Sequence, residues 1–364
     1  MAFSKLYCLS RWVYGDTVKS LDRILELGPS AAVFAASTGE AEARGYRNLR
    51  EVLQPIPVTV EDSFDLASIT KIMCTTAIIM DLISDGEVTL DTKISSILPK
   101  WKGAKDSITI EDLLRHRSGL EPWRPLYISQ SSIESSRDFI ARLDLAAPID
   151  SVRAYSDLGF IALGEILETV TNCSLESTFT SMIAQPYSLK KTQFGKPLTS
   201  PVSTSRGDRF EYEMVATKVP YQIPESAEEF SRWRHHVLEG EISDGNTFHL
   251  FGGASSHAGL FSTAHDILKF AGQIKNHPLF ATFTASGPDP EAHLGFISWT
   301  SSVAGCTDRI YGHTGFTGVA FGISSQHETE MVMLTNRTHT EGKLTLTSEM
   351  WQPVIDEYHE ALHA

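Results

Sequence analysis

The sequence has little cysteine, and its spacing fits neither a metal-binding nor a disulfide-bonded framework. The 364 residues include four cysteines, Cys8, Cys74, Cys173 and Cys306, with no C-x-x-C pair. Zinc knuckles need closely spaced cysteine pairs, and disulfide-stapled folds need several cysteines in a short chain. The pattern therefore predicts neither. Cys74 falls within an apolar helix-like segment, where we expect a buried free thiol.

Positive charge is also scarce. The chain has 31 lysines and arginines against 45 aspartates and glutamates, which gives a formal net charge of −14 at pH 7. Nucleic acids and anionic membrane surfaces both require a basic footprint on their partner. We therefore expect neither as a partner.

Long apolar runs are lacking too. The run after Lys71 is interrupted by Asp81 and Asp85 and is too short to span a bilayer, so no membrane span is expected. The first fifteen residues contain Lys5 and Arg11 and no apolar stretch of signal-peptide length. The sequence as given therefore predicts a cytoplasmic protein, and a periplasmic or secreted one if it is a trimmed form.

Three common catalytic or nucleotide-binding motifs are absent. The sequence contains no G-x-S-x-G elbow, no P-loop and no G-x-G-x-x-G loop, which argues against an α/β-hydrolase and a nucleotide-binding protein. No cofactor is expected. With 41% hydrophobic and 21% charged residues, the chain can bury a large core and has room for two lobes.

The most informative feature that is present is the S-x-x-K tetrapeptide at residues 68–71. It lies where a strand-like segment, Ser63 to Ala67, meets an apolar helix-like segment, Ile72 to Ile83. One helical turn places the Ser68 hydroxyl and the Lys71 amine on the same face, so the lysine can hold or take the proton of the serine. This arrangement predicts an acyl-enzyme nucleophile. The alternative is that Ser68 only caps the helix.

A second S-x-x-K, at residues 188–191, serves as an internal control. It follows Pro186 in a short polar stretch and has no long apolar helix behind it to fix the two side chains. The sequence context therefore favours Ser68 as the nucleophile.

Two further segments complete a constellation. Tyr155-Ser156-Asp157 comes just before a helical pattern, and His313-Thr314-Gly315 follows a short strand-like run. The order and separation of the three segments resemble the serine penicillin-recognising enzymes, the superfamily of class C β-lactamases, DD-peptidases, D-aminopeptidases and related esterases. The middle segment is similar to the Y-x-N form and the last to the H-T-G form of the motifs of that superfamily.

The resemblance covers most of the chain and is nearest to the class C branch. The similar stretches are Phe64 to Lys71, Ile110 to Leu120, Tyr155 to Glu165, Ala258 to Thr263 and Gly312 to Gly318. The segment from about Gly195 to Phe251 resembles no family that we can name. His257, beside one of the similar stretches, is expected to be structural, with site lining as the alternative.

The resemblance implies a role for each candidate residue. Ser68 would be acylated, and Lys71 would share the proton of the Ser68 hydroxyl. Burial would lower the pKa of the Lys71 amine. Tyr155 would protonate the leaving group, the alternative being a core aromatic residue. The oxyanion hole would be the backbone N–H groups of Ser68 and Phe316. The remaining expected substrate-binding residues are Asp157, His313, Thr314 and Gly315.

Two departures from the family pattern bear on the substrate. Asp157 replaces an asparagine, and an ionised carboxylate accepts hydrogen bonds but cannot donate one. It could instead pair with Lys71, keep that amine protonated and shift the base role to Tyr155. His313 replaces the commoner lysine, and a neutral imidazole holds a carboxylate less firmly than an ammonium does. Both changes favour an ester, or an amide with little negative charge, over carboxylate-bearing β-lactams.

The order of elements predicts an α+β fold. Strands near both chain ends and helices between them indicate an antiparallel β-sheet flanked by helices and formed from both chain ends, with an inserted all-α domain and the site at their junction. We expect a sheet domain from residues 1–80 and 250–364, and a mainly helical domain from 81–249 with a variable cleft-lining segment at about 195–251. The predicted helices are about 17–27, 72–83, 108–115, 135–143, 158–170 and 345–362, and the predicted strands are about 31–38, 43–48, 294–299, 318–324 and 331–335.

One further motif weighs less. Residues 359–363 match H-E-x-x-H, in which two histidines on one helix face bind zinc. The motif ends one residue before the last residue of the sequence and has no evident third ligand, so no metal site is predicted.

The sequence therefore predicts a serine hydrolase that works through an acyl-enzyme on Ser68 and cleaves a small-molecule ester, amide or peptide. One alternative is a DD-carboxypeptidase or weak β-lactamase acting on D-amino acid amides. An alternative of another class is a penicillin-binding or scaffold protein with the same fold and no turnover.

Overall fold

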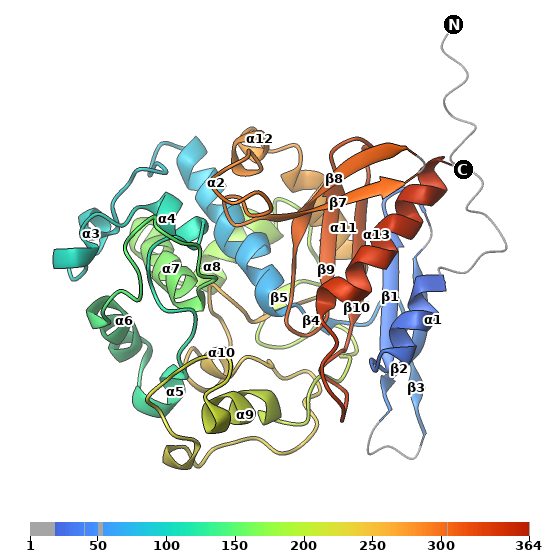
Figure 1. The fold of residues 1–364 in the computed structure, drawn as a ribbon, viewed down its shortest axis with the longest axis horizontal. Coiled ribbons are helices and arrows are strands. Elements are labelled where there is room, and N and C mark those ends of the chain that lie inside the picture. The colour runs from blue at the N-terminus through green and yellow to red at the C-terminus, as the bar shows by residue number, and fades with distance from the viewer. Residues whose placement is uncertain (1–18, 40, 50–53, 304, 364) are drawn as a thin grey trace, which may run out of the picture.

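The structure is a computed structural model that describes residues 19–39, 41–49, 54–303 and 305–363 (Figure 1). Within these ranges the largest sheet has seven antiparallel strands in the order β3-β2-β1-β10-β9-β8-β7. The strands are β1 (Ala31–Ala36), β2 (Glu42–Asn48), β3 (Ile56–Pro57), β7 (Ile297–Val303), β8 (Cys306–Thr314), β9 (Ala320–Ser324) and β10 (Glu330–Thr335). Because β1 pairs with β10, both ends of the chain build the sheet, and the predicted α+β fold is confirmed.

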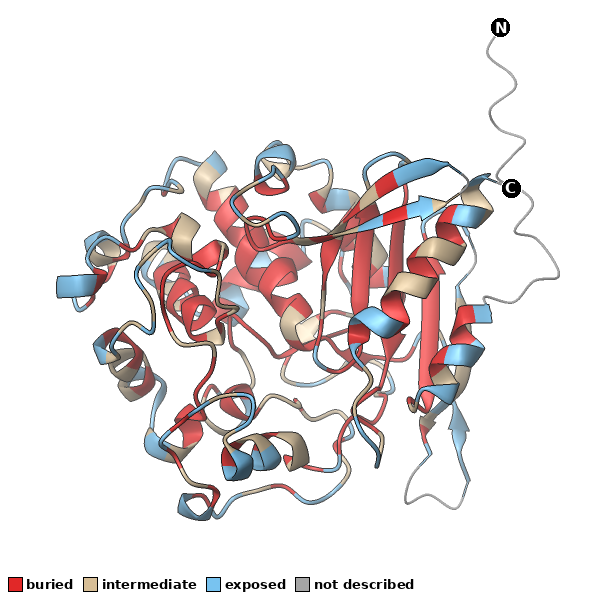
Figure 2. Cartoon of the chain, in the orientation of Figure 1, coloured by how far each residue is buried: buried red, intermediate tan, exposed pale blue. Residues whose placement is uncertain are grey.

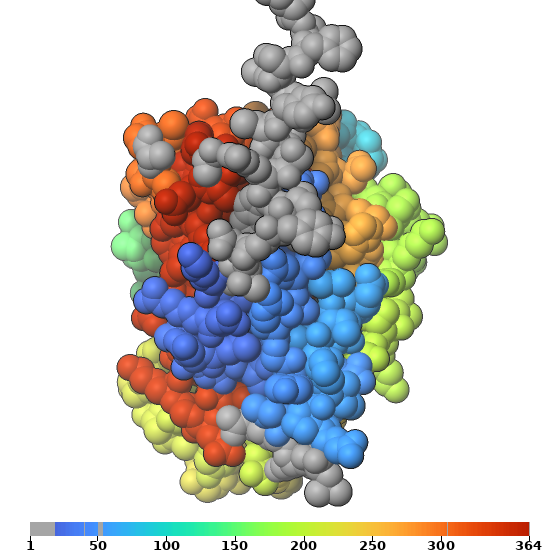
Figure 3. All heavy atoms as spheres, turned by 90° about the vertical axis from the view of Figure 1, so that its right-hand side faces the viewer, coloured from blue at the N-terminus to red at the C-terminus, as the bar shows by residue number. Residues whose placement is uncertain are grey.

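The inner strand β1 is buried along its whole length because helices cover both faces of the sheet. Its even-numbered residues, such as Phe34, pack with α1 (Lys19–Glu26) and α13 (Thr347–His363). Its odd-numbered residues, such as Val33, face the side covered by α11 (Ala264–Ile274). A strand covered on both faces needs no polar alternation, which explains its continuous apolar sequence. Figure 3 shows α1 (blue) and α13 (red) on one side of the molecule.

The middle of the chain is mainly helical and lies at the left in Figure 1. Its helices are α2 (Ala77–Ser84), α3 (Ile94–Ile97), α4 (Ile110–Leu114), α5 (Leu126–Ser129), α6 (Ile133–Arg142), α7 (Asp157–Thr171), α8 (Leu175–Phe179), α9 (Arg209–Thr217) and α10 (Gly245–His249), and α12 (Phe280–Phe283) comes later. One cluster of buried apolar side chains continues from the sheet into α2 and α7 (Figure 2). The division into domains near residues 80 and 250 therefore stays a prediction.

A second, three-stranded sheet connects the two regions. Its order is β4 (Phe64–Asp65), β6 (Leu260–Ser262) and β5 (Gln193–Phe194). After β4 the chain makes a 3₁₀ turn at Ala67–Ile69 and a π-helical segment at Lys71–Thr76 before α2 begins. The predicted helices and strands are present with ends displaced by four residues or fewer, and the start of the first helix at residue 17 lies outside the described residues.

Within the described residues, one apolar helical stretch, Ala67–Ser84, is long enough to cross a membrane, and a bent pair, Asp157–Thr171 with Leu175–Ala184, passes the same test together. Of the first stretch, 78% is buried within the molecule, which fits a core helix. Cys74 is a buried free thiol, as predicted. Cys8 and the first fifteen residues, on which the localisation depends, lie outside the described residues.

Candidate active site

The predicted nucleophile follows a strained turn. Ser68 lies in the 3₁₀ turn after β4, and the preceding Ala67 has a φ of +43°. Residues other than glycine adopt this conformation at a cost, and such residues cluster at functional sites. The buried Asp65 carboxylate holds the turn, because it accepts hydrogen bonds from the backbone N–H of Ala67 (2.9 Å) and of Ser243 (2.7 Å). Burial raises the pKa of Asp65 to about 6, although both donors oppose the rise.

Lys71 lies at the centre of the site and is fully buried. Its Nζ donates to Ser68 Oγ at 3.0 Å and to the His257 carbonyl at 3.2 Å, and lies 2.7 Å from Asp157 Oδ1. The predicted pairing of serine and lysine is therefore present, although the segment that begins at Lys71 is π-helical. Single π-helical turns are frequent at functional sites.

The pKa of Lys71 is shifted in the direction opposite to the expected one. Burial alone lowers the pKa of this amine, but the charges of Asp157 and Tyr155 and their hydrogen bonds outweigh burial and raise it above the usual lysine range. The prediction that desolvation lowers this pKa is therefore wrong. The pairing with Asp157 that the sequence allowed is present, and Lys71 is an ammonium at neutral pH.

The beginning of α7 places Tyr155 and Asp157. Ser156 caps this helix, since its Oγ accepts from the Gly159 N–H at 3.1 Å. The Ser156 N–H in turn donates to His116 Nδ1 at 2.9 Å, and the His116 ring lies against the Tyr155 ring with centroids 4.4 Å apart. Burial and the Lys71 charge lower the pKa of His116 well below its usual range. A neutral imidazole therefore supports the tyrosine.

His313 does not contact the cavity beside Ser68. It is 2% exposed, and its Nδ1 hydrogen-bonds the Thr314 carbonyl at 2.7 Å. Its ring stacks on Tyr155 with centroids 6.0 Å apart. Burial and the Lys71 charge lower the pKa of His313 to about 3, so the ring is neutral. The ring lies against Tyr155, and the predicted contact of His313 with a substrate stays a prediction.

The other two residues of the H-T-G segment bring the end of β8 close to the nucleophile. A Cβ at Gly315 would lie 2.5 Å from the Leu66 carbonyl oxygen, so only glycine fits this approach. Thr314 pairs with Ala320 across β8 and β9. Phe316, the next residue, is 41% exposed and lines the same cavity as Ser68. The two predicted oxyanion donors thus lie on the wall of one cavity, and their role stays a prediction.

That cavity has a volume of about 170 Å³ and combines aromatic with acidic walls. Nine of its sixteen lining residues come from the segment 195–251. The lining residues are Ala67, Ser68, Trp123, Tyr155, Asp157, Ser205, Gly207, Asp208, Phe210, Glu211, Met214, Tyr221, Ser243, Asp244, Ala258 and Phe316. Among them are four carboxyl side chains and no lysine, arginine or histidine.

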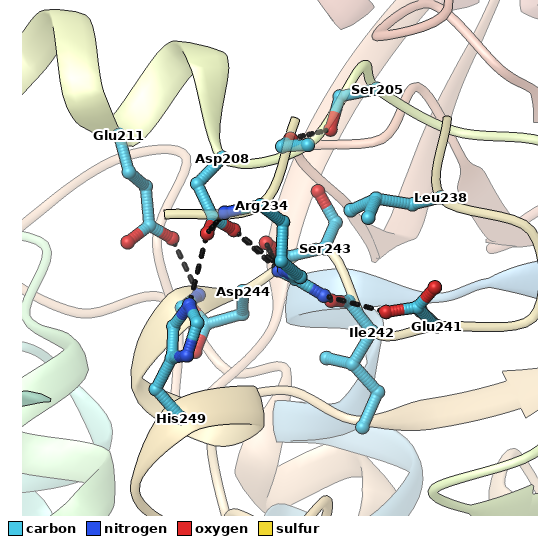
Figure 4. A network of polar contacts seen from close by, with 12 residues as sticks. Ser205, Asp208, Glu211, Arg234, Leu238, Glu241, Ile242, Ser243, Asp244 and His249 are labelled. Carbon is cyan, nitrogen blue, oxygen red and sulfur yellow. Dashed lines mark hydrogen bonds and ion pairs between the residues drawn. The ribbon is translucent and has the colours of Figure 1, made fainter. Parts of the chain in front are cut away.

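A polar network fixes the acidic wall (Figure 4). Arg234 donates to Asp208 Oδ1 from Nε (2.8 Å) and from Nη2 (2.6 Å), and His249 Nε2 lies 2.9 Å from Asp208 Oδ2. Glu211 accepts from the Gly245 N–H at 2.6 Å. Burial, then the charge of nearby Asp244, raises the pKa of Glu211 to about 8. Glu211 is therefore mostly protonated at neutral pH.

These wall residues are the part of the site that the sequence did not identify. The segment matches no motif, and its charged residues are separated by up to 36 positions, from Asp208 to Asp244. The buried pairing of Asp208 with Arg234 leaves no local pattern in the sequence. In the second S-x-x-K, at residues 188–191, the serine is not paired with the lysine: Ser188 is exposed, and Lys191 contacts Glu61 instead.

Asp157, Asp244 and His257 bring one potential metal ligand each within 4.8 Å of one another. His257 Nε2 lies 3.1 Å from Asp244 Oδ1, and the Lys71 ammonium forms an ion pair with Asp157. A cation already faces these carboxylates and opposes a second one, so we assign no metal there.

Comparison with known proteins agrees with this architecture. Residues 26–349 match the family model described as Beta-lactamase. The chain is 28% identical to an N-acetylmuramyl-L-alanine amidase of Bacillus subtilis (strain 168), over 82% of this chain and 73% of that protein. It is also 28% identical to a putative D-alanyl-D-alanine carboxypeptidase of Salmonella gallinarum, over 82% of this chain and 74% of that protein.

Solved structures share the fold at lower identity. A D-amino acid amidase from Ochrobactrum anthropi SV3 superposes with a TM-score of 0.68 at 19% identity, covering 94% of this chain and 97% of that chain. EstCE1, described as a hydrolase with promiscuous acyltransferase activity, has a TM-score of 0.66 at 19% identity, covering 95% and 97%. The family match supports a serine hydrolase, as predicted. Because that match spans most of the sequence, the chain belongs to the β-lactamase family.

Proposed function

We propose that this serine hydrolase forms an acyl-enzyme on Ser68 and cleaves an ester or amide of a small molecule without negative charge near the scissile bond. The observation that carries the proposal is the buried Lys71, which holds Ser68 Oγ and is neutralised by Asp157. Its ammonium donates to the nucleophile beside a cavity without a cationic wall.

The protonation of Lys71 decides how the nucleophile is activated. An ammonium has no lone pair, so it cannot take the serine proton. Tyr155 is the remaining candidate base, and the Lys71 Nζ lies 4.9 Å from its ring centroid. To take that proton, Tyr155 must enter the cycle as a phenolate, and the nearby Lys71 ammonium offsets the phenolate charge until the proton is transferred. Tyr155 then returns the proton to the leaving group, and the N–H groups of Ser68 and Phe316 stabilise the oxyanion.

Deacylation follows the same path in reverse. Water attacks the acyl-Ser68 carbonyl, Tyr155 takes a proton from the water, and the serine oxygen leaves with that proton. The product acid is released, and Lys71 keeps its proton throughout. This cycle needs no cofactor.

The walls of the cavity support the proposed substrate class. Lys71 balances Asp157, and Arg234 balances Asp208, while Asp244 contacts the His257 ring and has no lysine or arginine partner among the described residues. A substrate carboxylate would be repelled there. The aromatic side chains of Trp123, Phe210, Tyr221 and Phe316 line the same cavity and favour an apolar or aromatic group.

A second candidate is an amidase that acts on an amide bearing a free ammonium group. The acidic wall at Asp208 and Asp244 favours it, and one structural neighbour is named a D-amino acid amidase. The predicted DD-carboxypeptidase alternative is less well supported, because its substrates end in a carboxylate. The alternative without turnover would leave a stable acyl-Ser68.

Three matched esters test the charge preference. The p-nitrophenyl esters of butyrate, 4-aminobutyrate and succinate differ mainly in the charge at the far end of the acyl chain. We expect kcat/KM for the anionic ester to be at least tenfold below that of the neutral one, and the cationic ester to match or exceed the neutral one. An anionic ester that reacts fastest would contradict the proposed substrate class, while hydrolysis by Ser68→Ala would contradict the nucleophile.

A further inference from the structure

Three histidines converge at the end of α13, away from the cavity beside Ser68. His359 and His363 lie one turn apart on this helix, and His327 lies in the loop between β9 and β10. One ring nitrogen from each lies within 4.8 Å of the others. The expectation that the H-E-x-x-H segment lacks a third ligand is therefore wrong, because His327 comes from a loop 32 residues earlier in the sequence.

The contact between the two helix histidines is short. His359 Nε2 and His363 Nε2 are 3.1 Å apart. Two ring nitrogens at this distance need either a shared proton or a cation between them, because both carry lone pairs when unprotonated. Two nitrogen ligands of one tetrahedral zinc, each about 2.0–2.1 Å from the metal, are separated by roughly 3.3 Å. The observed spacing is close to that of a chelating pair.

A chain of hydrogen bonds behind His359 fixes its tautomer. The Ser301 hydroxyl donates to Asp356 Oδ1 at 2.7 Å, so its oxygen is available to accept from His359 Nδ1, 2.9 Å away. With Nδ1 protonated, Nε2 presents a lone pair toward the other two rings. Metal-binding histidines commonly have such a partner on the second nitrogen.

The loop that carries His327 is also held in place. Buried Asp308 accepts from the Ser324 hydroxyl (2.6 Å) and from the N–H groups of Ser325 and Gln326 (3.1 Å each). The N–H of His327 donates to Ser324 Oγ at 2.8 Å. The third ring is therefore positioned by its own loop, and its direction does not depend on α13.

We propose that His327, His359 and His363 form a binding site for a divalent transition-metal ion such as Zn²⁺. Imidazole ligands suit zinc, copper or nickel, and the exposed side at His363 leaves a position for water. None of the three residues lines the cavity beside Ser68. The metal would tie the last turn of α13 to the β9–β10 loop and stabilise the fold without taking part in hydrolysis.

The test is metal titration of the full-length protein stripped of metal. Zn²⁺ is added in competition with a chromophoric chelator, and Co²⁺ is added separately to record its visible absorption spectrum. We expect one ion per chain, a spectrum of nitrogen and oxygen ligation, and a melting temperature that rises with metal concentration. His327→Ala and His363→Ala should each weaken Zn²⁺ binding at least tenfold.

Controls separate this site from adventitious binding. His265→Ala removes an exposed histidine elsewhere and should leave the affinity unchanged. Circular dichroism of His327→Ala and His363→Ala without metal shows whether each variant is folded; if either is not, His327→Gln and His363→Gln replace them. Zn²⁺ affinity unchanged in folded variants at both positions, a thiolate band in the Co²⁺ spectrum, or no stoichiometric binding by the unmodified chain would each overturn the proposal.

Discussion

At the scale of single residues, the site depends on one buried ion pair. The Lys71 side chain has no exposed surface, and its Nζ lies 2.7 Å from Asp157 Oδ1. The negative charge of Asp157 keeps the Lys71 amine protonated. Removing one member of a buried pair leaves the other uncompensated, and the remaining group then changes its pKa. We therefore expect the identity of residue 157 to control which group can act as the base.

The first prediction concerns Asp157→Asn. Without the carboxylate, burial dominates and the pKa of Lys71 falls, so the amine can accept the Ser68 proton. We expect hydrolysis of a neutral ester to stay within about tenfold, roughly 1.4 kcal/mol, because Tyr155 and the backbone donors are unchanged. Acylation by a carboxylate-bearing β-lactam should improve. Kinetics of both substrates on both proteins decide, and a loss of orders of magnitude for both would place Asp157 in the working proton path.

The second prediction identifies the nucleophile. Ser68→Ala should abolish labelling by a fluorophosphonate, while Ser188→Ala should leave it unchanged, because Lys191 contacts Glu61 and not Ser188. Intact-protein mass spectrometry after exposure to the probe gives the answer. Full labelling of Ser68→Ala would refute the acyl-enzyme assignment.

At the scale of elements, helix starts and loops position the reactive groups. The cap of α7 fixes Asp157 at the first helical position and Tyr155 just before it. A carboxylate at a helix N-terminus is also stabilised by the helix dipole. The segment 195–251 has few regular elements and is held by buried ion pairs such as Asp208 with Arg234.

The third prediction compares two helix caps. Ser156→Ala and Ser174→Ala each remove a side-chain cap, of α7 and α8 respectively, and each should lower the free energy of unfolding by about 1 kcal/mol. Only Ser156→Ala should also lower kcat, since α7 carries Asp157. Urea denaturation and ester kinetics measure the two effects. Equal activity of the two variants would show that the cap does not position the site.

The fourth prediction concerns Glu211. Its pKa in the folded protein is about 8, against 4.5 for an unperturbed glutamate. The stability contribution of the protonated form is complete below pH 4.5 and is lost as the pH rises toward 8. Glutamine does not titrate, so the Glu211→Gln variant lacks this pH-dependent loss of stability. The free energy of unfolding of the variant should therefore fall less between pH 5 and 8 than that of the wild type. Parallel slopes in denaturant titrations across this range would contradict the assignment.

At the scale of the whole molecule, a feature of the structure could be predicted from the sequence where the residues that form it are close together along the chain. The pairing of Ser68 with Lys71 was predictable because one helical turn joins them, and strands β1, β9 and β10 were predictable from their apolar runs. The acidic wall was not, because Asp208, Arg234 and Asp244 meet only through tertiary folding. The raised pKa of Lys71 follows from Asp157, 86 residues away in the sequence; the sequence allowed this pairing through the family motif, and tertiary folding brings the two groups together.

The fifth prediction separates catalysis from metal binding. Ester hydrolysis should persist in excess chelator, since side chains and backbone groups carry the proposed chemistry. The melting temperature of protein isolated with metal should fall under the same treatment. If hydrolysis were lost on chelation and recovered with Zn²⁺, the three-histidine cluster would have a catalytic role and not only a stabilising one.

The pairing of β1 with β10 has a consequence for how the chain reaches this structure. Ala32 lies opposite Thr335, so the centre of the sheet joins residues about 300 positions apart. Contacts of such long range form slowly, because a large loop must close before they contribute. During synthesis, the apolar strand AAVFAA is made long before its partner. Until the last third of the chain emerges, this strand has an open edge that can pair with other chains, so a nascent chain released before β10 is expected to aggregate.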